Sequence, residues 1–416
     1  MAQTTSRDVA RLRLGAAGAA VTVATVVTNA LAYVVPMLGA RRLTAADLGA
    51  LATVLALAAI AAVPGFGLQI ALAAHRARSG TGDTARLGLR TAALTAGVTV
   101  AAAPVLTIAL RLPLALTLLL ATTTFATVLS GRWLGELQGQ QRFLRLAAAM
   151  VAVAVGRYGG LVAGLLLGRG PEMCLLLTTL TGLLTLPLLN RLAGPPRPAD
   201  PATSGPPAVE VAGAPIAPST ATPRLGASQV MTACGATLAM LTISYADLIL
   251  ARQLLPAAAS GAYAVGAVLT KGALWAPQVV TLLVLPRLAQ GDRRARLVAL
   301  ALILACGASL VVSSAVAGSL AFRLVGGADY LHLAGTAPMF AAVGALYAVV
   351  FMLVNDRVAT AARWPAAPLW LATAGLTAAA ALIAPRTVTG VLTCSLVVAA
   401  LAAAVMVWLV FGRGRH

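Results

Sequence analysis

Residues 241–290 decide the class of this chain; they read LTISYADLILARQLLPAAASGAYAVGAVLTKGALWAPQVVTLLVLPRLAQ. Apolar residues dominate the stretch. Among them stand an acid (Asp247), the only lysine of the chain (Lys271) and a proline inside a helical run (Pro277). Long apolar runs are typical of helices that cross a membrane, and an ionisable residue inside such a run is a candidate functional residue.

The rest of the chain has the same character. Of its 416 residues, 60% are hydrophobic and only 10% are charged, which is too few charges to cover a water-soluble domain. We therefore predict an all-α polytopic membrane protein with about twelve transmembrane helices. The expected spans are residues 14–40, 48–74, 91–110, 113–131, 146–168, 173–193, 225–251, 259–286, 297–320, 333–354, 365–384 and 388–411.

The basic residues follow the pattern of a membrane protein. The formal net charge is +19, but the arginines stand in short runs between apolar segments, where they set topology and contact anionic lipid headgroups. Aromatic residues are few, at 4%, and form no face together with the basic ones. We expect membrane lipids, and not nucleic acid, as partners.

Arginine also predicts the orientation. With the N-terminus inside, 21 arginines fall on inside segments and seven on outside segments. This bias predicts that both termini are cytoplasmic, in a multi-pass protein of the cytoplasmic (plasma) membrane. The first apolar segment is too long for a signal peptide, so we expect it to remain as the first spanning helix.

A proline-rich segment divides the chain into two parts. Residues 194–224 hold nine of the 22 prolines and no apolar periodicity, which predicts an extended cytoplasmic linker. It separates an N-terminal six-helix lobe, 1–193, from a C-terminal six-helix lobe, 225–416. LGARRLTAADLGAL (38–51) aligns without gaps with LARQLLPAAASGAY (250–263) and matches Gly49 to Gly261. Two repeats of equal topology predict pseudo-symmetry about an axis along the membrane normal.

Proline and glycine interrupt corresponding segments of the two lobes. AAVPGFGLQ in the second segment contains Pro64, Gly65 and Gly67 and ends on Gln69, and LWAPQ in the eighth contains Pro277. Paired interruptions of this kind are typical of a transporter's binding site. We expect hinges or kinks at these residues and at Pro36 of the first segment. An ordinary kink tolerated by packing is the alternative explanation.

The first segment carries a polar stripe. Thr22, Thr25, Asn29, Tyr33 and Pro36 are spaced 3, 4, 4 and 3 residues apart, which puts them on one helical face. Because lipid offers these groups no hydrogen bonds, the stripe should face a partner helix or a wet cavity. The same spacing places Lys271, Trp275 and Gln278 on one face of the eighth segment.

Three charges are expected inside the membrane. Lys271 lies at a depth of roughly 18 Å, where an ammonium needs water or a partner; contact with an anion in a cavity and a structural ion pair both explain it. Asp247 lies nearer the outer end, by on the order of 10 Å. It is explained by a pair with Lys271 across a tilted helix, by a pair with Arg157, or by a proton or cation site. Arg157 would bind a phosphate or anchor helices.

The sequence offers no catalytic or metal site. The four cysteines are far apart inside apolar runs, and the three histidines lie at loop edges and the C-terminus, so we expect neither a metal centre nor a cofactor. No phosphate loop, nucleotide fingerprint or Ser/His/Asp set occurs. We therefore expect a protein that is not an enzyme and that draws energy from H⁺, Na⁺ or the membrane potential.

Several segments resemble the polysaccharide and lipid-linked oligosaccharide flippases within the multidrug/oligosaccharidyl-lipid/polysaccharide (MOP) exporter superfamily, which also contains the MATE transporters. The matching stretches are LGARRLTAADLGAL with AVPGFGLQ, RWLGELQGQQRF (132–143), DLILARQLLPAAASGAYAVGAVLTKGALWAPQ (247–278) and LVGGADY (324–330). The resemblance spans both lobes.

The resemblance implies a V-shaped, alternating-access transporter of two six-helix lobes. Segments 1, 2, 7 and 8 would line a central cavity for a polyprenyl-diphosphate-linked glycan, and Lys271 and Arg157 would meet its diphosphate. Polysaccharide-assembly enzymes would be partners. The chain has fewer cavity cations than such a flippase is expected to have.

Three other functions remain open. A cation-coupled multidrug antiporter would use Asp247 as its coupling carboxylate, although acids and aromatics are few. A membrane glycosyltransferase or polymerase would need catalytic groups on large outer loops, and the loops here are short. A transport-inactive scaffold would tolerate the small number of cavity charges.

Overall fold

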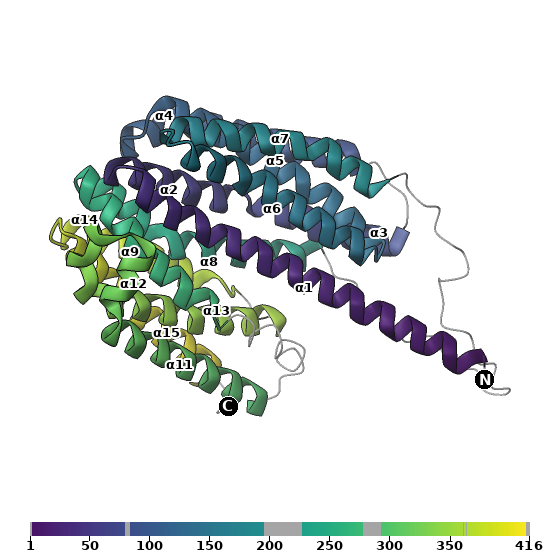
Figure 1. Cartoon of the computed structure of the whole chain (residues 1–416). Helices are drawn as coiled ribbons and strands as arrows, with labels where there is room; N and C mark the ends of the chain where they lie inside the picture. The colour runs from purple at the N-terminus through teal and green to yellow at the C-terminus, as the bar shows by residue number, and fades with distance from the viewer. Residues whose placement is uncertain are drawn as a thin grey trace.

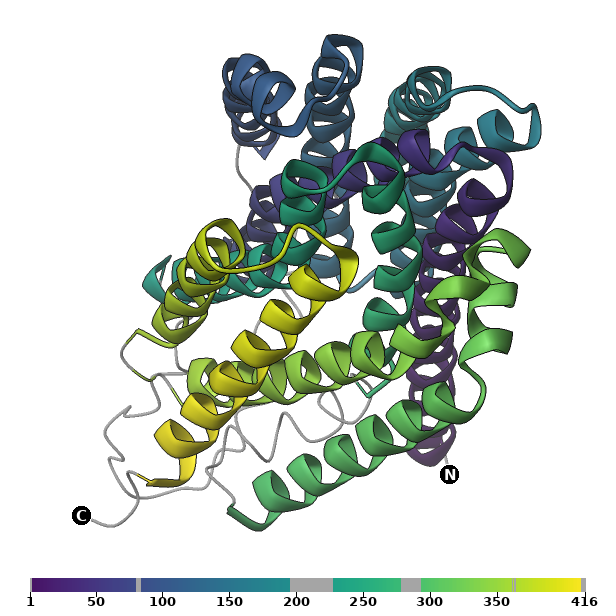
Figure 2. The same cartoon turned by 90° about the vertical axis from the view of Figure 1, so that its left-hand side faces the viewer.

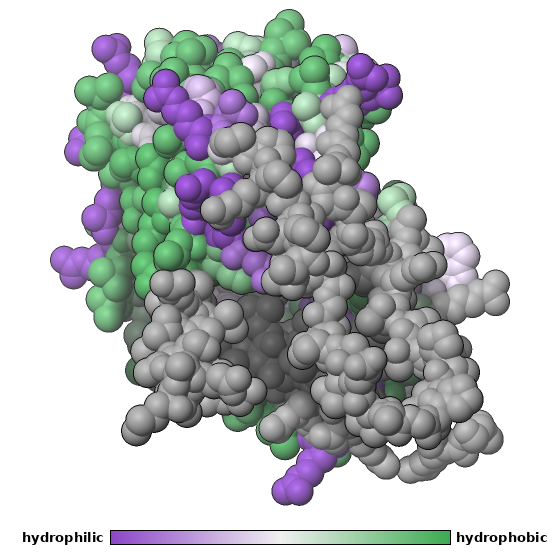
Figure 3. Space-filling model, turned by 90° about the vertical axis from the view of Figure 1, so that its right-hand side faces the viewer, coloured by the Kyte–Doolittle hydropathy of each residue, from purple (hydrophilic) through white to green (hydrophobic). Residues whose placement is uncertain are grey.

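The computed structural model describes residues 2–79, 84–194, 227–277, 293–360, 362 and 364–412. Within these ranges all regular secondary structure is helical (Figure 1). Ten of the helices are long and apolar enough to cross a membrane. Figure 3, which shows the face on the right of Figure 1, has hydrophilic side chains interspersed among apolar ones.

The helices form two groups, which meet on the left of Figure 1 and separate towards the right. In the first half α6 packs on α1 and α7, and α5 packs on α3, α4 and α7. In the second half α13 packs on α9, α11 and α15. The first half consists of α1 (Ala2–Arg42), α2 (Ala45–Ala61), α3 (Val63–Ser79), α4 (Thr84–Leu110), α5 (Leu114–Gly139), α6 (Phe143–Leu166) and α7 (Pro171–Ala193). The second consists of α8 (Ala227–Leu254), α9 (Ala257–Trp275), α11 (Arg293–Val316), α12 (Gly318–Val325), the 3₁₀ helix η2 (Ala328–Thr336), α13 (Ala337–Ala359), α14 (Ala367–Leu382) and α15 (Val388–Phe411).

The all-α fold predicted from the sequence is confirmed, and each expected span coincides at least in part with a helix. Two helices are shorter than their expected spans: α14 has 16 residues, and α9 ends at Trp275, two residues before Pro277. Except for Gly194, the predicted linker lies outside the described residues. The lobe boundaries therefore remain predictions.

The second expected span is interrupted, and proline explains the position. α2 ends at Ala61 and α3 begins at Val63, with the Ala62 N–H bonded back to the carbonyl of Ala58. Pro64 has no N–H for the carbonyl four residues earlier, and its ring crowds that turn. By contrast, α1 continues through Pro36 without a break in the helix.

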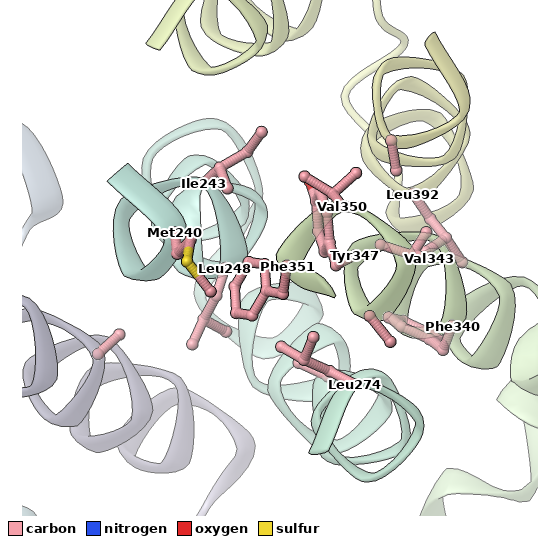
Figure 4. Packing of buried hydrophobic residues seen from close by; sticks show 14 of the residues in the cluster. Met240, Ile243, Leu248, Leu274, Phe340, Val343, Tyr347, Val350, Phe351 and Leu392 are labelled. Carbon is pink, nitrogen blue, oxygen red and sulfur yellow. The ribbon is translucent and has the colours of Figure 1, made fainter. Parts of the chain in front are cut away.

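The core of the second half is organised around α13. Tyr347, Phe340 and Phe351 of this helix are almost fully buried and pack against residues of α8, α9 and α15 (Figure 4). The ring of Phe340 meets Tyr263 of α9 edge-on, with 5.3 Å between the ring centroids. Gly344 lies against the backbone of Thr270, so close that a β-carbon would overlap it. This helix therefore fixes the position of α9 in the second half.

The two halves are joined at the end of the molecule where α1 ends, which we call the closed end. Arg252 of α8, only 8% exposed, donates to the carbonyl oxygens of Leu110 (3.1 Å), Arg111 (3.0 Å) and Ala46 (3.4 Å) in the other half. Arg41 donates to the carbonyl of Leu324 at 2.8 Å. Figure 2, which looks onto this end, shows the α1–α2 and α8–α9 connections next to each other. One guanidinium thus satisfies two carbonyls at the C-terminal end of α4 and also reaches a carbonyl in the first turn of α2.

Below these contacts, α2 and α9 cross at two glycines. A β-carbon on Gly49 would stand 3.0 Å from the backbone nitrogen of Gly261, and one on Gly261 would overlap the carbonyl of Ala45. These glycines are the pair that the repeat alignment matched. Residues related by a two-fold axis touch each other only at that axis, so the predicted pseudo-symmetry would place its axis at this crossing.

At the opposite end, three side-chain contacts between described residues each lie within one half. Arg296 pairs with Asp356 at 2.9 Å in the second half. Arg132 pairs with Glu136 at 3.1 Å in the first, where Gln69 also donates to Gln138 at 3.0 Å. These contacts keep each half rigid and do not hold the halves together.

The glycine crossing predicts a selective loss of stability. Gly261→Ala should lower the free energy of unfolding by about 1–3 kcal/mol, because the methyl group overlaps the Ala45 carbonyl. Gly272→Ala is the control on the same helix, since a β-carbon there meets nothing within 4 Å. Thermal unfolding of the detergent-solubilised protein should show a lower Tm for the first variant alone. Equal Tm values would contradict the crossing.

The closed end predicts a local change in backbone protection. Arg252→Gln removes the donors that hold three carbonyls, so amide hydrogen exchange should accelerate at residues 44–52 and 257–264. Arg323→Gln, an exposed arginine at the same end, is the control and should leave exchange there unchanged. Unchanged exchange in Arg252→Gln would show that this residue does not join the halves.

Candidate functional site

Lys271 lies where three helices from both halves meet. Its Nζ donates to the carbonyl oxygen of Ser244 on α8 and lies 3.5 Å from the centroid of the Tyr245 ring. The hydroxyl of Tyr33 on α1 donates to the carbonyl of Lys271 at 3.2 Å. A carbonyl and an aromatic face both stabilise an ammonium group away from bulk water. The lysine is therefore held within the protein.

Arg157 of α6 brings a second cation towards the same place. Its guanidinium lies 5.5 Å from the centroid of the Tyr158 ring. Tyr245 is within electrostatic reach of Arg157, Tyr158 and Tyr33. We call Tyr33, Arg157, Tyr158, Tyr245 and Lys271 the central cluster. It combines two cations with three tyrosines, and each half supplies one of the cations.

Asp247 is close to this cluster but is turned into the second half. It is only 2% exposed, and its carboxylate accepts from the Tyr263 hydroxyl and from the Leu248 N–H, both at 2.8 Å. Asp247 and Lys271 are within electrostatic reach of each other. Among the described residues, however, the recorded ion pairs join Asp247 to neither Lys271 nor Arg157. Neither of these two alternative pairings is therefore present in the described part of the chain.

More hydroxyl groups surround Asp247. Tyr347 and Ser395 are fully buried, and Ser395 contacts Tyr263 through its side chain. The Tyr347 hydroxyl has no hydrogen-bond partner in the described part of the chain. A search of the described residues found no group of His, Cys, Asp or Glu that could hold a metal ion.

Of the other predicted site residues, two are exposed, one is hydrogen-bonded to another glutamine, and one lies outside the described residues. Asn29 is exposed one turn before Tyr33 on α1, and Trp275 is 37% exposed with its ring 6.2 Å edge-on from Phe351. Gln69 of α3 donates to the side chain of Gln138 on α5. Gln278 lies outside the described residues.

Only some of the predicted hinge residues lie at helix interruptions. Gly65 packs against the backbone of Val128, and a β-carbon on Gly67 would crowd Cys234 of α8. Pro64 stands next to the helix break, Pro277 follows the end of α9, and Pro36 lies in a continuous helix. The helix interruptions occur at Pro64 and before Pro277.

The sequence analysis missed the tyrosines. Of the six in the chain, Tyr158, Tyr245, Tyr263 and Tyr347 surround the two charged sites without having been singled out. A signal existed, because aromatic residues are rare here and a tyrosine in an apolar run needs a partner for its hydroxyl. Which charge each tyrosine would meet depends on packing between helices far apart in sequence.

Comparison with known proteins identifies the fold. No protein-family model and no curated protein matches the chain. The solved eukaryotic MATE transporter AtDTX14 is similar at 13% identity and a TM-score of 0.57, over 95% of this chain and 93% of that one. An outward-facing multidrug resistance MATE family transporter of the MOP superfamily is similar at 13% identity and a TM-score of 0.55, over 95% of this chain and 93% of that one. A mutant of the Vibrio cholerae MATE transporter VcmN is similar at 15% identity and a TM-score of 0.52, over 95% of this chain and 97% of that one.

These similarities extend over nearly the whole length of each chain. The chain therefore has the fold of the MATE transporters of the MOP superfamily, as the sequence resemblance implied. At identities this low the likeness concerns the fold, and the residues of the site carry any further argument.

The Asp247 contacts predict unequal roles for two buried tyrosines. Tyr263→Phe removes a donor from a buried carboxylate and should lower the free energy of unfolding by about 1–3 kcal/mol. Tyr347→Phe is the matched control and should be close to neutral, because its hydroxyl has no partner among the described residues. Tm values of the two variants compare them directly. Equal losses would mean that the Tyr263 hydroxyl does not stabilise Asp247.

Proposed function

We propose that this chain is an alternating-access transporter that moves an anionic lipid-linked oligosaccharide or polysaccharide precursor across the cytoplasmic membrane. The central cluster is the observation that carries the proposal. Lys271 and Arg157 come from opposite halves, and the one carboxylate near them, Asp247, is occupied by donors of its own half. The charge left for a ligand is positive.

The chemistry of the cluster suits a diphosphate joined to a sugar. Arginine offers a planar set of donors to phosphate oxygens, and lysine offers a compact charge. Tyrosine combines a flat apolar ring with a hydroxyl, as a sugar requires. Because each half supplies one cation, a bound diphosphate would draw the halves together, which links binding to a change of conformation.

The positive-inside bias gives this arrangement a direction. If both termini are cytoplasmic, the closed end held by Arg252 and Arg41 faces outward. The central cluster would then receive its substrate from the cytoplasmic side. We expect the state described here to be the loading state, with membrane lipids around it and polysaccharide-assembly enzymes as partners.

Asp247 supports a second candidate, a cation-coupled multidrug antiporter. A buried carboxylate beside the unpartnered Tyr347 hydroxyl would hold a proton or Na⁺, and the solved structures of similar fold include a multidrug transporter. The two cations of the central cluster would repel an organic cation, which is why we place this function second. In either case Asp247 is our candidate for coupling to H⁺, Na⁺ or the membrane potential.

Reconstitution tests the proposed substrate. Liposomes containing the purified protein and a fluorescent polyprenyl-diphosphate oligosaccharide should move the lipid between leaflets. Lys271→Met should slow this about tenfold or more, because a hydrogen bond to a charged group is lost. Lys271→Arg keeps the charge and should retain most of the rate.

The same liposomes separate the two candidates. Organic-cation efflux driven by an imposed H⁺ or Na⁺ gradient, with no lipid movement, would replace the flippase by the antiporter. Lipid movement at the same rate in wild type and Lys271→Met would remove the lysine from the substrate site.

A further inference from the structure

A small cavity lies inside the first half, between α5, α6 and α7. Its volume is about 20 Å³, room on the order of one water molecule or one monatomic ion. Apolar side chains, among them Val153 and Leu189, form part of its wall. The polar residues that line it are Arg157, Thr123, Thr127, Ser130, Thr178 and Thr185.

Arg157 differs from other cations of the spans in having no acid beside it. Arg132 pairs with Glu136 and Arg296 with Asp356, while Lys271 has Asp247 in electrostatic reach. Among the described residues no ion pair or hydrogen bond is recorded for the guanidinium of Arg157, which only stacks over Tyr158. An uncompensated charge at this depth in a membrane protein is costly.

The hydroxyl groups of the cavity can turn towards an anion at little cost. Those of Thr127, Thr178 and Thr185 donate to the carbonyl four residues earlier in their own helices. In an α-helix that carbonyl also accepts a backbone N–H. If the hydroxyl rotates, the carbonyl keeps one bond, so the hydroxyls are available as donors.

We propose that this cavity binds a halide ion, chloride in the cell, as the counter-ion of Arg157. The guanidinium supplies the charge and the threonine and serine hydroxyls supply further donors. The apolar part of the wall lowers the local dielectric constant and strengthens the attraction. The volume of about 20 Å³ favours a monatomic ion. Because Arg157 also belongs to the central cluster, this ion would compete with a diphosphate for the guanidinium. The proposal does not depend on the transported substrate.

Thermal unfolding of the full-length protein in detergent, monitored by tryptophan fluorescence, tests the site. A ligand that binds the native state raises Tm with its concentration. At constant ionic strength, replacing sodium gluconate by sodium chloride or bromide should therefore raise the Tm of the wild type until the site is saturated. An equal Tm in all three salts would overturn the proposal.

Two variants locate the effect. Arg157→Gln should abolish the dependence on chloride, and Thr127→Val combined with Ser130→Ala should raise the half-saturating concentration about tenfold or more. Thr377→Val is the control, because this threonine makes the same bond within its helix but is exposed on α14. If Thr377→Val weakens the response as much as the cavity variants, the site is elsewhere.

A crystal of the wild type grown with bromide gives a direct readout that does not depend on the stability of any variant. Anomalous density should lie between α5, α6 and α7 beside Arg157. Bromide found only at other positions, with this cavity empty, would overturn the proposal even if halides raise Tm.

Discussion

The burial of charge within apolar helices is the constraint on which this structure depends. An ionised side chain at membrane depth must find its solvation within the protein, and the chain meets this need in different ways. Lys271 uses the carbonyl of Ser244 and the ring of Tyr245. Asp247 uses Tyr263 and a backbone N–H. Arg252 uses three carbonyls of the opposite half. Except for the backbone N–H at Asp247, which belongs to its own helix, these partners lie on other helices or in the other half, so the charges also determine how helices face one another.

The arrangement of the halves follows from the same contacts. Gly49 and Gly261 let α2 and α9 approach until their backbones touch, and Arg252 then reaches across just beyond them. Most polar contacts between the halves lie at this end, and Tyr33 adds one at Lys271. Two rigid groups that pivot near an axis and carry their charges at the interface have the geometry that alternating access requires.

Much of the architecture was predictable because it rests on local physics. The apolar runs identified the helices, and Pro64 marked the break between α2 and α3. The repeat alignment matched Gly49 with Gly261 before their contact was known. The ionic partners were not predictable. Counting residues along each helix placed Asp247 and Lys271 at different depths and left several explanations of the acid open, but its partners are the Tyr263 hydroxyl of α9 and the backbone N–H of Leu248.

The sequence by itself determined that this chain crosses a membrane with helices in two similar sets, because hydropathy and the positions of proline act within one segment. It also placed Lys271, Asp247 and Arg157 inside those helices. Only the tertiary structure decided which face each charge occupies, that Lys271 and Arg157 approach the same tyrosines, and that Arg157 borders a hydroxyl-lined cavity. Those outcomes depend on helix rotation and on packing between different helices, with partners from 27 to 238 positions apart, which the pattern of a single segment does not contain.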